Sequence, residues 1–222
     1  MKKGCTFVPL DQTKWYRRET FWYFSQMAPT GYSLTTEVDV SRMRRTLREK
    51  GMKFYPAYLW LATRTLNRQT EFRLAEKDGA LGYYESLTPL YAVFHEDDHS
   101  FSLMWTEYDD DFRDFYAAFL ENGTKYGENH GILAQKELLP PPNAYTVSCL
   151  PFVTFSHFAV HSYENKAYYF PSLEAGKWRQ EGEKLLLPLS ITCHHAATDG
   201  WHVHRFLEKL QNDMNAFDEA LQ

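Results

Sequence analysis

Apolar and polar residues alternate along YSLTTEVDV, which covers residues 32–40, with Thr36 as the one polar residue on the apolar face. Tyr32, Val38 and Val40 fall on one face of an extended chain, whereas Glu37 and Asp39 fall on the other. A period of two residues is typical of a strand with one face in the core and one face exposed. We therefore predict a half-buried β-strand in this segment.

The C-terminal segment has a different period, because its apolar residues recur every three or four positions. The stripe consists of Val203, Phe206, Leu207, Leu210, Met214 and Phe217. This spacing predicts one apolar face of an α-helix, and Asp199 just before it suits the N-cap. The preceding LLLPLSITCHH is a nearly continuous apolar run that predicts a buried strand. The sequence HHAATDG is thus expected at a strand-to-helix junction, where loops held by rigid elements commonly carry chemistry.

Other segments complete a mixed set of elements. Helical patterns occur over residues 12–27, 42–50, 54–68 and 109–127, and strand-like patterns over 90–108 and 146–160. Ser41 suits the N-cap of the second of these helices, and Pro56 suits the first turn of the third. We find no repeat and no long linker. The pattern therefore predicts a single domain over residues 1–222 with an α/β fold, of the α+β two-layer sandwich type, in which helices cover a mixed, mostly buried β-sheet.

Composition narrows the function classes. Aromatic residues make up 17% of the 222 residues, and the formal net charge is −5 without a clustered basic face. This balance argues against a nucleic-acid partner. No apolar run reaches the ~18 residues that a membrane span requires, so no membrane partner is expected. The three cysteines lack CxxC spacing and indicate free thiols in a reducing, cytoplasmic environment.

Four histidines near the strand-to-helix junction allow three interpretations. His194 and His195 point to opposite sides of an extended chain, and His202 and His204 point apart on a helix, so their spacing does not favour a metal site. A second interpretation is that the histidines pack in the core while Asp199 caps the helix. Proton transfer is the third, because a neutral imidazole held rigidly at a strand end can accept a proton near pH 7. The spacing to Asp199 favours His195 as the base, and the residues alone leave the last two readings open.

The motif HHAATDG resembles the HHxxxDG active-site motif of chloramphenicol acetyltransferases and, more distantly, of other coenzyme A-dependent acyltransferases. WYRRETF, GYSLTTEVDV, KFYPAYLWL, VFHEDD, SCLPFVTF and GWHVHRF also resemble segments of that family, in the same order. The likeness covers almost the whole chain. It implies a homotrimer with active sites between subunits, acetyl-CoA as co-substrate, a small-molecule acceptor and no metal.

The resemblance also implies roles for single residues. His195 would be the general base, and the hydroxyl of Ser148 would stabilise the oxyanion. Asp199 and Arg18 would form an ion pair that shapes the catalytic loop. His194 and His202 would be packing or hydrogen-bonding residues.

Further positions follow from the same resemblance. The residues expected to bind coenzyme A are Tyr55, Phe152, Lys177 and Trp178, with Glu174 at a position that holds a water near the oxyanion. The residues expected to bind the acceptor are Phe24, Ala28, Tyr32, Phe101 and Phe206. Phe24 stands where the family has a tyrosine, and Glu174 where it has a threonine. A charged carboxylate at position 174 would oppose a developing anion.

Three functions are compatible with the sequence. The first is O-acetyl transfer from acetyl-CoA to a hydroxyl of chloramphenicol or a related small acceptor, which would confer antibiotic resistance. The second keeps the same base but uses a different alcohol or thiol acceptor. The third is a non-catalytic trimeric relative that binds coenzyme A.

Overall fold

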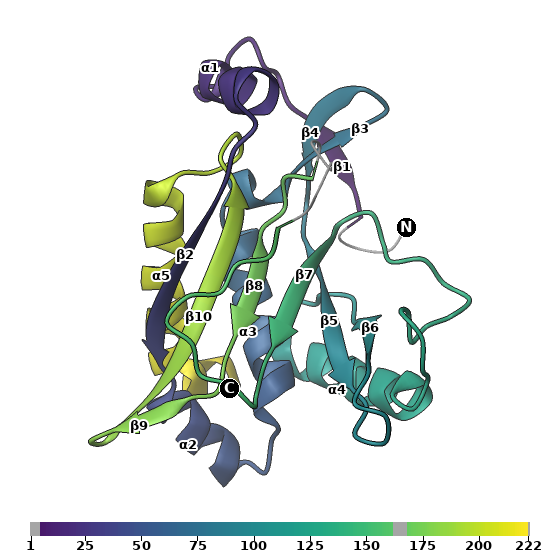
Figure 1. The fold of residues 1–222 in the computed structure, drawn as a ribbon, viewed down its shortest axis with the longest axis vertical. Helices are drawn as coiled ribbons and strands as arrows, with labels where there is room; N and C mark the ends of the chain where they lie inside the picture. Colours follow the sequence, from purple (N-terminus) through teal and green to yellow (C-terminus); the bar gives the residue numbers. More distant parts are fainter. Residues whose placement is uncertain (1–4, 162–167, 222) are drawn as a thin grey trace.

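The computed structural model describes residues 5–161 and 168–221. Its main sheet has seven strands, of which six follow the order β2-β10-β8-β7-β5-β6 while β9 pairs with β10 (Figure 1). These strands are β2 (Gly31–Asp39), β5 (Thr88–Phe94), β6 (Phe101–Trp105), β7 (Ala144–Cys149), β8 (Ser172–Ala175), β9 (Arg179–Glu181) and β10 (Lys184–His194). Strand β7 is parallel to β5 and β8, and the other pairs are antiparallel, so the sheet is mixed.

A smaller antiparallel sheet of three strands has the order β1-β4-β3. Its strands are β1 (Phe7–Pro9), β3 (Leu74–Lys77) and β4 (Ala80–Tyr84). In Figure 1 it lies near the end of the molecule that carries α1. The protein thus has a second, smaller sheet in addition to the main sheet that the sequence predicted.

Helices cover one face of the main sheet (Figure 1). The helices and helical turns are α1 (Arg18–Trp22), the π-turn η1 (Tyr23–Met27), α2 (Ser41–Glu49), α3 (Phe54–Asn67), η2 (Thr70–Arg73), α4 (Phe112–Tyr126), α5 (Gly200–Asn215) and η3 (Phe217–Leu221). The predicted two-layer arrangement of a mixed sheet and helices is therefore confirmed for the described residues.

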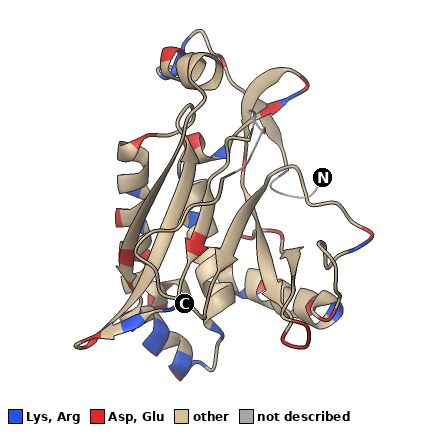
Figure 2. Cartoon of the chain, viewed as in Figure 1, with Lys and Arg blue, Asp and Glu red and all other residues tan. Residues whose placement is uncertain are grey.

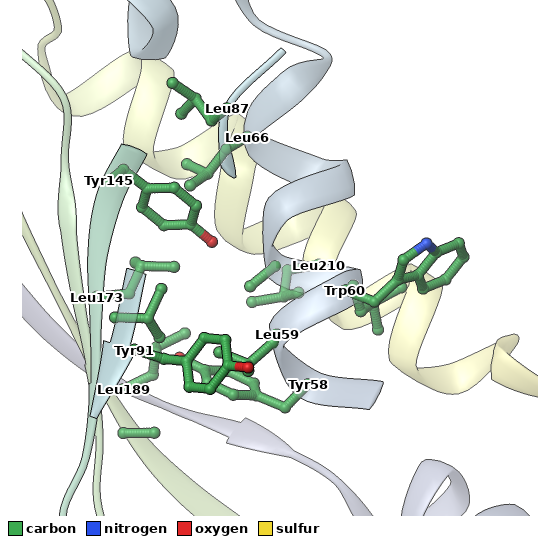
Figure 3. Packing of buried hydrophobic residues seen from close by; sticks show 14 of the residues in the cluster. Tyr58, Leu59, Trp60, Leu66, Leu87, Tyr91, Tyr145, Leu173, Leu189 and Leu210 are labelled. Carbon is green, nitrogen blue, oxygen red and sulfur yellow. The ribbon is translucent and has the colours of Figure 1, made fainter. Parts of the chain in front are cut away.

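The core lies between the sheet and α3. Side chains of Tyr91, Tyr145 and Leu173 from the strands meet Tyr58 and Leu59 from α3 (Figure 3), and all five are fully buried. The Tyr145 and Thr63 hydroxyls lie 2.8 Å apart and share a hydrogen bond, which satisfies two polar groups inside this layer. Part of the high aromatic content of the sequence thus lies in the interior between the sheet and the helices.

The opposite face of the main sheet is polar. Register places Ser190 of β10 opposite Glu174 of β8, and Ser148 of β7 opposite the same Glu174. Paired residues project to the same side of a sheet. Since Leu189 and Ile191 flank Ser190 and face the helices, the three polar residues point to the side without helices.

Two predicted element starts are wrong. The helix expected over residues 12–27 is reduced to α1 and the π-turn η1, because the residues before Arg18 form turns. Ser41 is the first helical residue rather than the N-cap, which is Val40, and the Ser41 hydroxyl donates to the carboxylate of Asp39. The Asp111 and Asp199 caps are both present, and each side chain accepts a backbone N–H of its helix.

Among the described residues, every helix is too short or too polar to cross a lipid bilayer. Figure 2 shows that charged residues occur mainly on the helices and on the turns at the edges of the sheet. The centre of the main sheet carries few of them in this view.

Candidate active site

The segment 195–199 is held tightly between β10 and α5. The backbone N–H of His195 donates to the carbonyl of Thr30 at 2.8 Å, which ties the end of β10 to the segment before β2. The N–H groups of Ala197 and Thr198 both donate to the carbonyl of His194. These bonds fix the backbone on both sides of the His195 ring.

The hydrogen bonds of His195 define its tautomer. Its Nδ1 lies 3.0 Å from the carbonyl oxygen of Thr198. A carbonyl can only accept a hydrogen bond, so Nδ1 carries the proton and Nε2 of the neutral ring keeps a lone pair. No other described residue hydrogen-bonds to Nε2. This is the tautomer that a general base requires.

Two aromatic rings hold the His195 imidazole in place. Phe24 stacks on it with ring centroids 4.0 Å apart and an interplanar angle of 19°. Tyr32 meets its edge at 5.2 Å, and the Tyr32 hydroxyl donates to the hydroxyl of Thr198. The ring is half-buried rather than enclosed in the core. The imidazole is thus immobilised but still accessible from one side.

The ion pair of Asp199 is made by Arg17, and the prediction of Arg18 is wrong. Nη1 of Arg17 lies 2.5 Å from Oδ2 of Asp199, and Nη2 donates to the backbone carbonyl of His195 at 3.4 Å. Arg17 is only 4% exposed, whereas Arg18 points to solvent and meets Glu19 at 3.7 Å. The correction follows from the helix start, because Arg17 precedes α1 and turns inward while Arg18 begins the exposed helix.

Asp199 is also the centre of a capping network. Its Oδ1 accepts the N–H of Trp201 and lies 2.8 Å from Nδ1 of His202, whose Nε2 lies 3.7 Å from Glu71. Burial alone would raise the pKa of Asp199, but hydrogen bonds from Arg17 and His202 outweigh it and lower the pKa to about 2. The carboxylate therefore stays charged and keeps the entrance of α5 fixed.

Exchange of Arg17 and of Arg18 for alanine should separate these two residues. Arg17→Ala is expected to lower the free energy of unfolding by about 2 kcal/mol, because it leaves the Asp199 carboxylate without its buried partner. Arg18→Ala should change it by less than about 0.5 kcal/mol, as an exposed substitution does. Denaturant unfolding at one fixed protein concentration measures both. Equal losses for the two variants would contradict the assignment.

Ser148 lies in a different environment from His195. It is half-buried on β7, and no other described residue hydrogen-bonds to its hydroxyl. Its neighbour across the strand pair is Glu174, which is fully buried and whose two carboxyl oxygens have no hydrogen-bond partner among the described residues. Burial raises the pKa of Glu174 to about 7, and the polar Ser172 side chain only partly offsets this effect.

Glu174 therefore differs from the charged group expected from the sequence. A carboxyl group with a pKa near 7 is neutral in a large share of molecules at pH 7 and can then donate a hydrogen bond. A neutral donor beside Ser148 would support a developing anion instead of opposing it. The position of Glu174 was predicted, but its protonation could not be, because it depends on burial.

Within one chain, His195 and Ser148 are far apart. Ser190 is level with Ser148 two strands away, which corresponds to roughly 10 Å across the sheet. His195 follows Ser190 by five positions, which adds roughly 16 Å along the strand direction. Strands β7 and β10 also run in opposite directions, so the two residues lie toward opposite ends of the sheet (Figure 1).

The residues expected to bind coenzyme A lie toward the Ser148 end. Phe152 is 66% exposed and its ring lies 5.1 Å from Phe94 at the end of β5. The Tyr55 hydroxyl donates to the carbonyl of Ala92 on the same strand.

The last two expected cofactor residues follow β8, just beyond the strand that carries Glu174. Trp178 packs edge-on against Phe54 at 5.4 Å and carries the Arg44 guanidinium at 4.9 Å over its ring. Lys177 is exposed beside it. The aromatic residues and the lysine thus offer apolar walls and an exposed positive charge in the same part of the fold.

The residues expected to bind the acceptor are split. Phe24 and Tyr32 contact the His195 ring directly, and Ala28 lies close to them in the chain, where its carbonyl accepts the Thr30 hydroxyl. Phe101 lies on β6, on the opposite edge of the sheet, and is 54% exposed opposite Phe94.

Phe206 does not fit an acceptor site, and that prediction is wrong. It is completely buried in the core, where its ring contacts Phe72 at 5.8 Å. The helical stripe in the sequence had already indicated this inward position, and the resemblance misled on this residue.

A groove of about 1150 Å³ lies over the polar face of the sheet. It is lined in part by Thr30, Ser33, Thr146, Ser172, Thr192 and His194. A second hollow of about 990 Å³ lies beside the segment that contains Phe24. His195 itself lines neither hollow, but its neighbours do, since Phe24 lines the second hollow and Tyr32 and His194 line the groove.

Sequence comparison places the chain among enzymes of known activity. A family profile described as chloramphenicol acetyltransferase matches residues 5–211. A chloramphenicol acetyltransferase of Clostridium perfringens is 37% identical over 211 residues, which cover 95% of this chain and 99% of that protein. One of Escherichia coli is 36% identical over 210 residues, which cover 95% of this chain and 94% of that protein.

Structural comparison agrees at the level of the fold. A solved structure of a chloramphenicol acetyltransferase has a TM-score of 0.86 at 23% identity, and the match covers 94% of this chain and all of that one. The dihydrolipoamide acetyltransferase of Azotobacter vinelandii has a TM-score of 0.65 at 18% identity, with 92% and 89% covered. Together with the sequence matches, these results show that the chain is an acyltransferase enzyme and belongs to the chloramphenicol acetyltransferase family.

Proposed function

We propose that the protein transfers an acetyl group from acetyl-CoA to a hydroxyl of chloramphenicol or a closely related small molecule. The family assignment supports this reaction class. The observation that carries the mechanism is the Nδ1 hydrogen bond of His195 to the Thr198 carbonyl, because it leaves Nε2 as the available base.

In the proposed reaction, Nε2 of His195 accepts the proton of the acceptor hydroxyl as the oxygen attacks the thioester carbonyl. The ring does not need to reorient, since Phe24 stacks on it and Thr198 holds its other nitrogen. The proton then passes from the imidazolium to the leaving thiolate, which departs as coenzyme A. The same imidazole thus carries out both proton transfers, and these steps need no metal ion.

Ser148 is the proposed donor to the tetrahedral oxyanion. Its hydroxyl makes no hydrogen bond within the described chain, and the neutral form of Glu174 beside it adds a second donor or orients a water. A single donor of this kind typically contributes ~10²–10³ in rate. The buried, unpaired carboxyl group of Glu174 is consistent with this role, because it is free to bond to a group supplied by the substrate side.

We further propose that each site is assembled from two chains of a homotrimer. The sheet register supports this, since His195 and Ser148 are too far apart in one chain to reach the same thioester. A rotationally symmetric ring gives every interface the His195 end of one chain and the Ser148 end of the next. Coenzyme A would then lie against the Ser148 end, where Tyr55, Phe152 and Trp178 gather.

A different alcohol or thiol acceptor is the second candidate. Phe24 favours it, because its ring lies directly on His195 and offers no hydroxyl to a polar acceptor. Pockets reject a substrate strongly when a hydrogen bond is lost, and only weakly over single methylene groups. A small change in the acceptor wall can therefore redirect the same chemistry to another molecule.

The direct assay mixes the protein with acetyl-CoA and chloramphenicol and follows release of the free thiol. We expect acceptor-dependent release together with formation of acetylated chloramphenicol, and growth of producing cells on the antibiotic. Release with other alcohols or thiols, but not with chloramphenicol, would establish the second candidate. Absence of thiol release with every acceptor would refute the proposed function.

A further inference from the structure

A second group of histidines lies far from His195, at the turn between β5 and β6. His95 and Asp97 belong to this turn, and His130 comes from the segment that follows α4. One potential ligand atom from each of the three lies within 4.8 Å of the other two. Figure 2 shows this turn as an acidic loop at the edge of the molecule. The turn lies across the main sheet from β10, so the group is separate from the proposed catalytic residues.

His95 is buried and held in one tautomer. It is 5% exposed, and its Nε2 lies 2.8 Å from the Ser102 hydroxyl. That hydroxyl donates its only proton to the carbonyl of Asn129 at 2.9 Å. It must therefore accept from His95, so Nε2 carries the proton and Nδ1 keeps the lone pair. No other described residue hydrogen-bonds to this Nδ1.

His130 is oriented by two carboxylates. Its Nδ1 lies 2.9 Å from Asp98, and its Nε2 lies 3.3 Å from Oδ2 of Asp97. Its ring stacks on that of His95 with centroids 4.1 Å apart. With Nδ1 donating to Asp98, the neutral form of His130 presents Nε2 as a lone pair next to Asp97 and His95.

This arrangement offers both the ligand atoms of a transition-metal site and the groups that orient those ligands. Two imidazole nitrogens and one carboxylate oxygen converge, which is a ligand set that suits Zn²⁺ with a water as fourth ligand. Ser102 on His95 and Asp98 on His130 supply the oxygen acceptors that metal-bound histidines usually have on their second nitrogen. In a tetrahedral zinc site, neighbouring ligand atoms lie about 3.3 Å apart. The pair formed by His130 and Asp97 already has this spacing. The His95 ring is stacked on that of His130, so it has to tilt for its Nδ1 to face the same ion.

We propose that His95, Asp97 and His130 bind a divalent transition metal ion of the zinc class. The ion would join the β5–β6 turn to the segment after α4, two parts of the chain separated by more than thirty residues. Its role would be structural, since the turn lies across the main sheet from β10, at whose end His195 lies. The inference does not depend on the reaction proposed above.

The test is titration of the purified, chelator-treated protein with Zn²⁺ by calorimetry, together with the absorption spectrum of the Co²⁺ form. We expect one ion per chain, with a dissociation constant in the micromolar range. His130→Ala should weaken binding at least ~100-fold, and Asp98→Asn about 10-fold, because it weakens the hydrogen bond that orients His130 through Nδ1. His99→Asn is the matched control, because His99 is exposed in the same turn, outside the three-residue group, and its positive φ tolerates asparagine.

Three outcomes would contradict the proposed metal site. One is no binding at millimolar Zn²⁺. Another is equal affinity for the wild type and for a His130→Ala variant whose circular dichroism shows that it is folded. The third is a thiolate-to-cobalt absorption band, which would assign the ion to the cysteines instead. Retained binding in His99→Asn with loss in His130→Ala would establish it.

Discussion

Replacing His195 by alanine is expected to lower kcat/KM for acetyl transfer by between ~10² and ~10⁴, which is the usual contribution of a general base. The Nε2 lone pair is fixed by the Thr198 carbonyl and by the stacked ring of Phe24, so no neighbouring group can take over its position. His194 cannot substitute, because its Nδ1 accepts the N–H of Ala196 and its ring packs against Tyr169. The loss should appear in kcat, since the base acts in the chemical step.

His204→Ala is the matched control for this substitution. His204 is an exposed histidine on α5 whose ring centroid lies 5.3 Å from that of Trp201. Steady-state thiol release by both variants, with circular dichroism to verify folding, gives the comparison. A loss of less than tenfold in His195→Ala, or an equal loss in His204→Ala, would show that His195 is not the base.

Replacing Glu174 by glutamine is expected to remove a large pH dependence of stability. Burial raises the pKa of Glu174 from 4.5 to about 7, so between these values the folded protein keeps a proton that the unfolded chain releases. Stability from this group is therefore complete below about pH 4.5 and is lost as the pH rises through 7. One pKa unit corresponds to about 1.4 kcal/mol, so the full effect is roughly 3 kcal/mol.

The expected result is a difference between variant and wild type that grows with pH. Glu174→Gln stays neutral throughout, so it should gain roughly 3 kcal/mol relative to wild type between pH 5 and pH 8. Chemical denaturation at a fixed chain concentration across this range measures the difference. Glu49→Gln, at an exposed helix position, provides the control and should give a difference that does not vary with pH. A flat difference for Glu174→Gln would mean that the carboxyl group is charged in the folded protein.

The sequence was sufficient to locate the strand-to-helix junction and its histidine. The apolar run of β10 and the stripe of α5 are local patterns, and each is strong enough to define an element on its own. Asp199 followed from its place before the stripe. The Asp199 carboxylate does more than cap α5, since it also binds the side chains of Arg17 and His202.

The choice between Arg17 and Arg18 lay beyond the sequence. Two adjacent arginines differ only in the direction in which they point, and that direction depends on the residue at which α1 begins. Helix starts depend on local hydrogen bonds and are uncertain by one or two residues from sequence patterns. Because the sequence pattern predicted one long helix over residues 12–27, it did not predict the turn that directs Arg17 inward.

The relation between Ser148, Glu174 and His195 also required the structure. Strand register joins Ser148 to Glu174 across twenty-six positions of sequence, and no local period reveals such a pairing. The protonation of Glu174 depends on its burial in the folded sheet, which the sequence does not show. The contact between His95 and His130 could not be predicted from the sequence, because the two residues are thirty-five positions apart and meet only after β6 and α4 have folded between them.

The claim that each site combines two chains is tested most directly by co-producing His195→Ala and Ser148→Ala chains with different affinity tags. Each variant alone should be nearly inactive in thiol release with acetyl-CoA and chloramphenicol. In mixed trimers, a site is intact when its histidine and its serine come from the two different variants, which random assembly gives for about a quarter of the sites. Recovery of about a quarter of the wild-type activity per chain is the predicted result. Mixed trimers no more active than the average of the two variants would contradict the account.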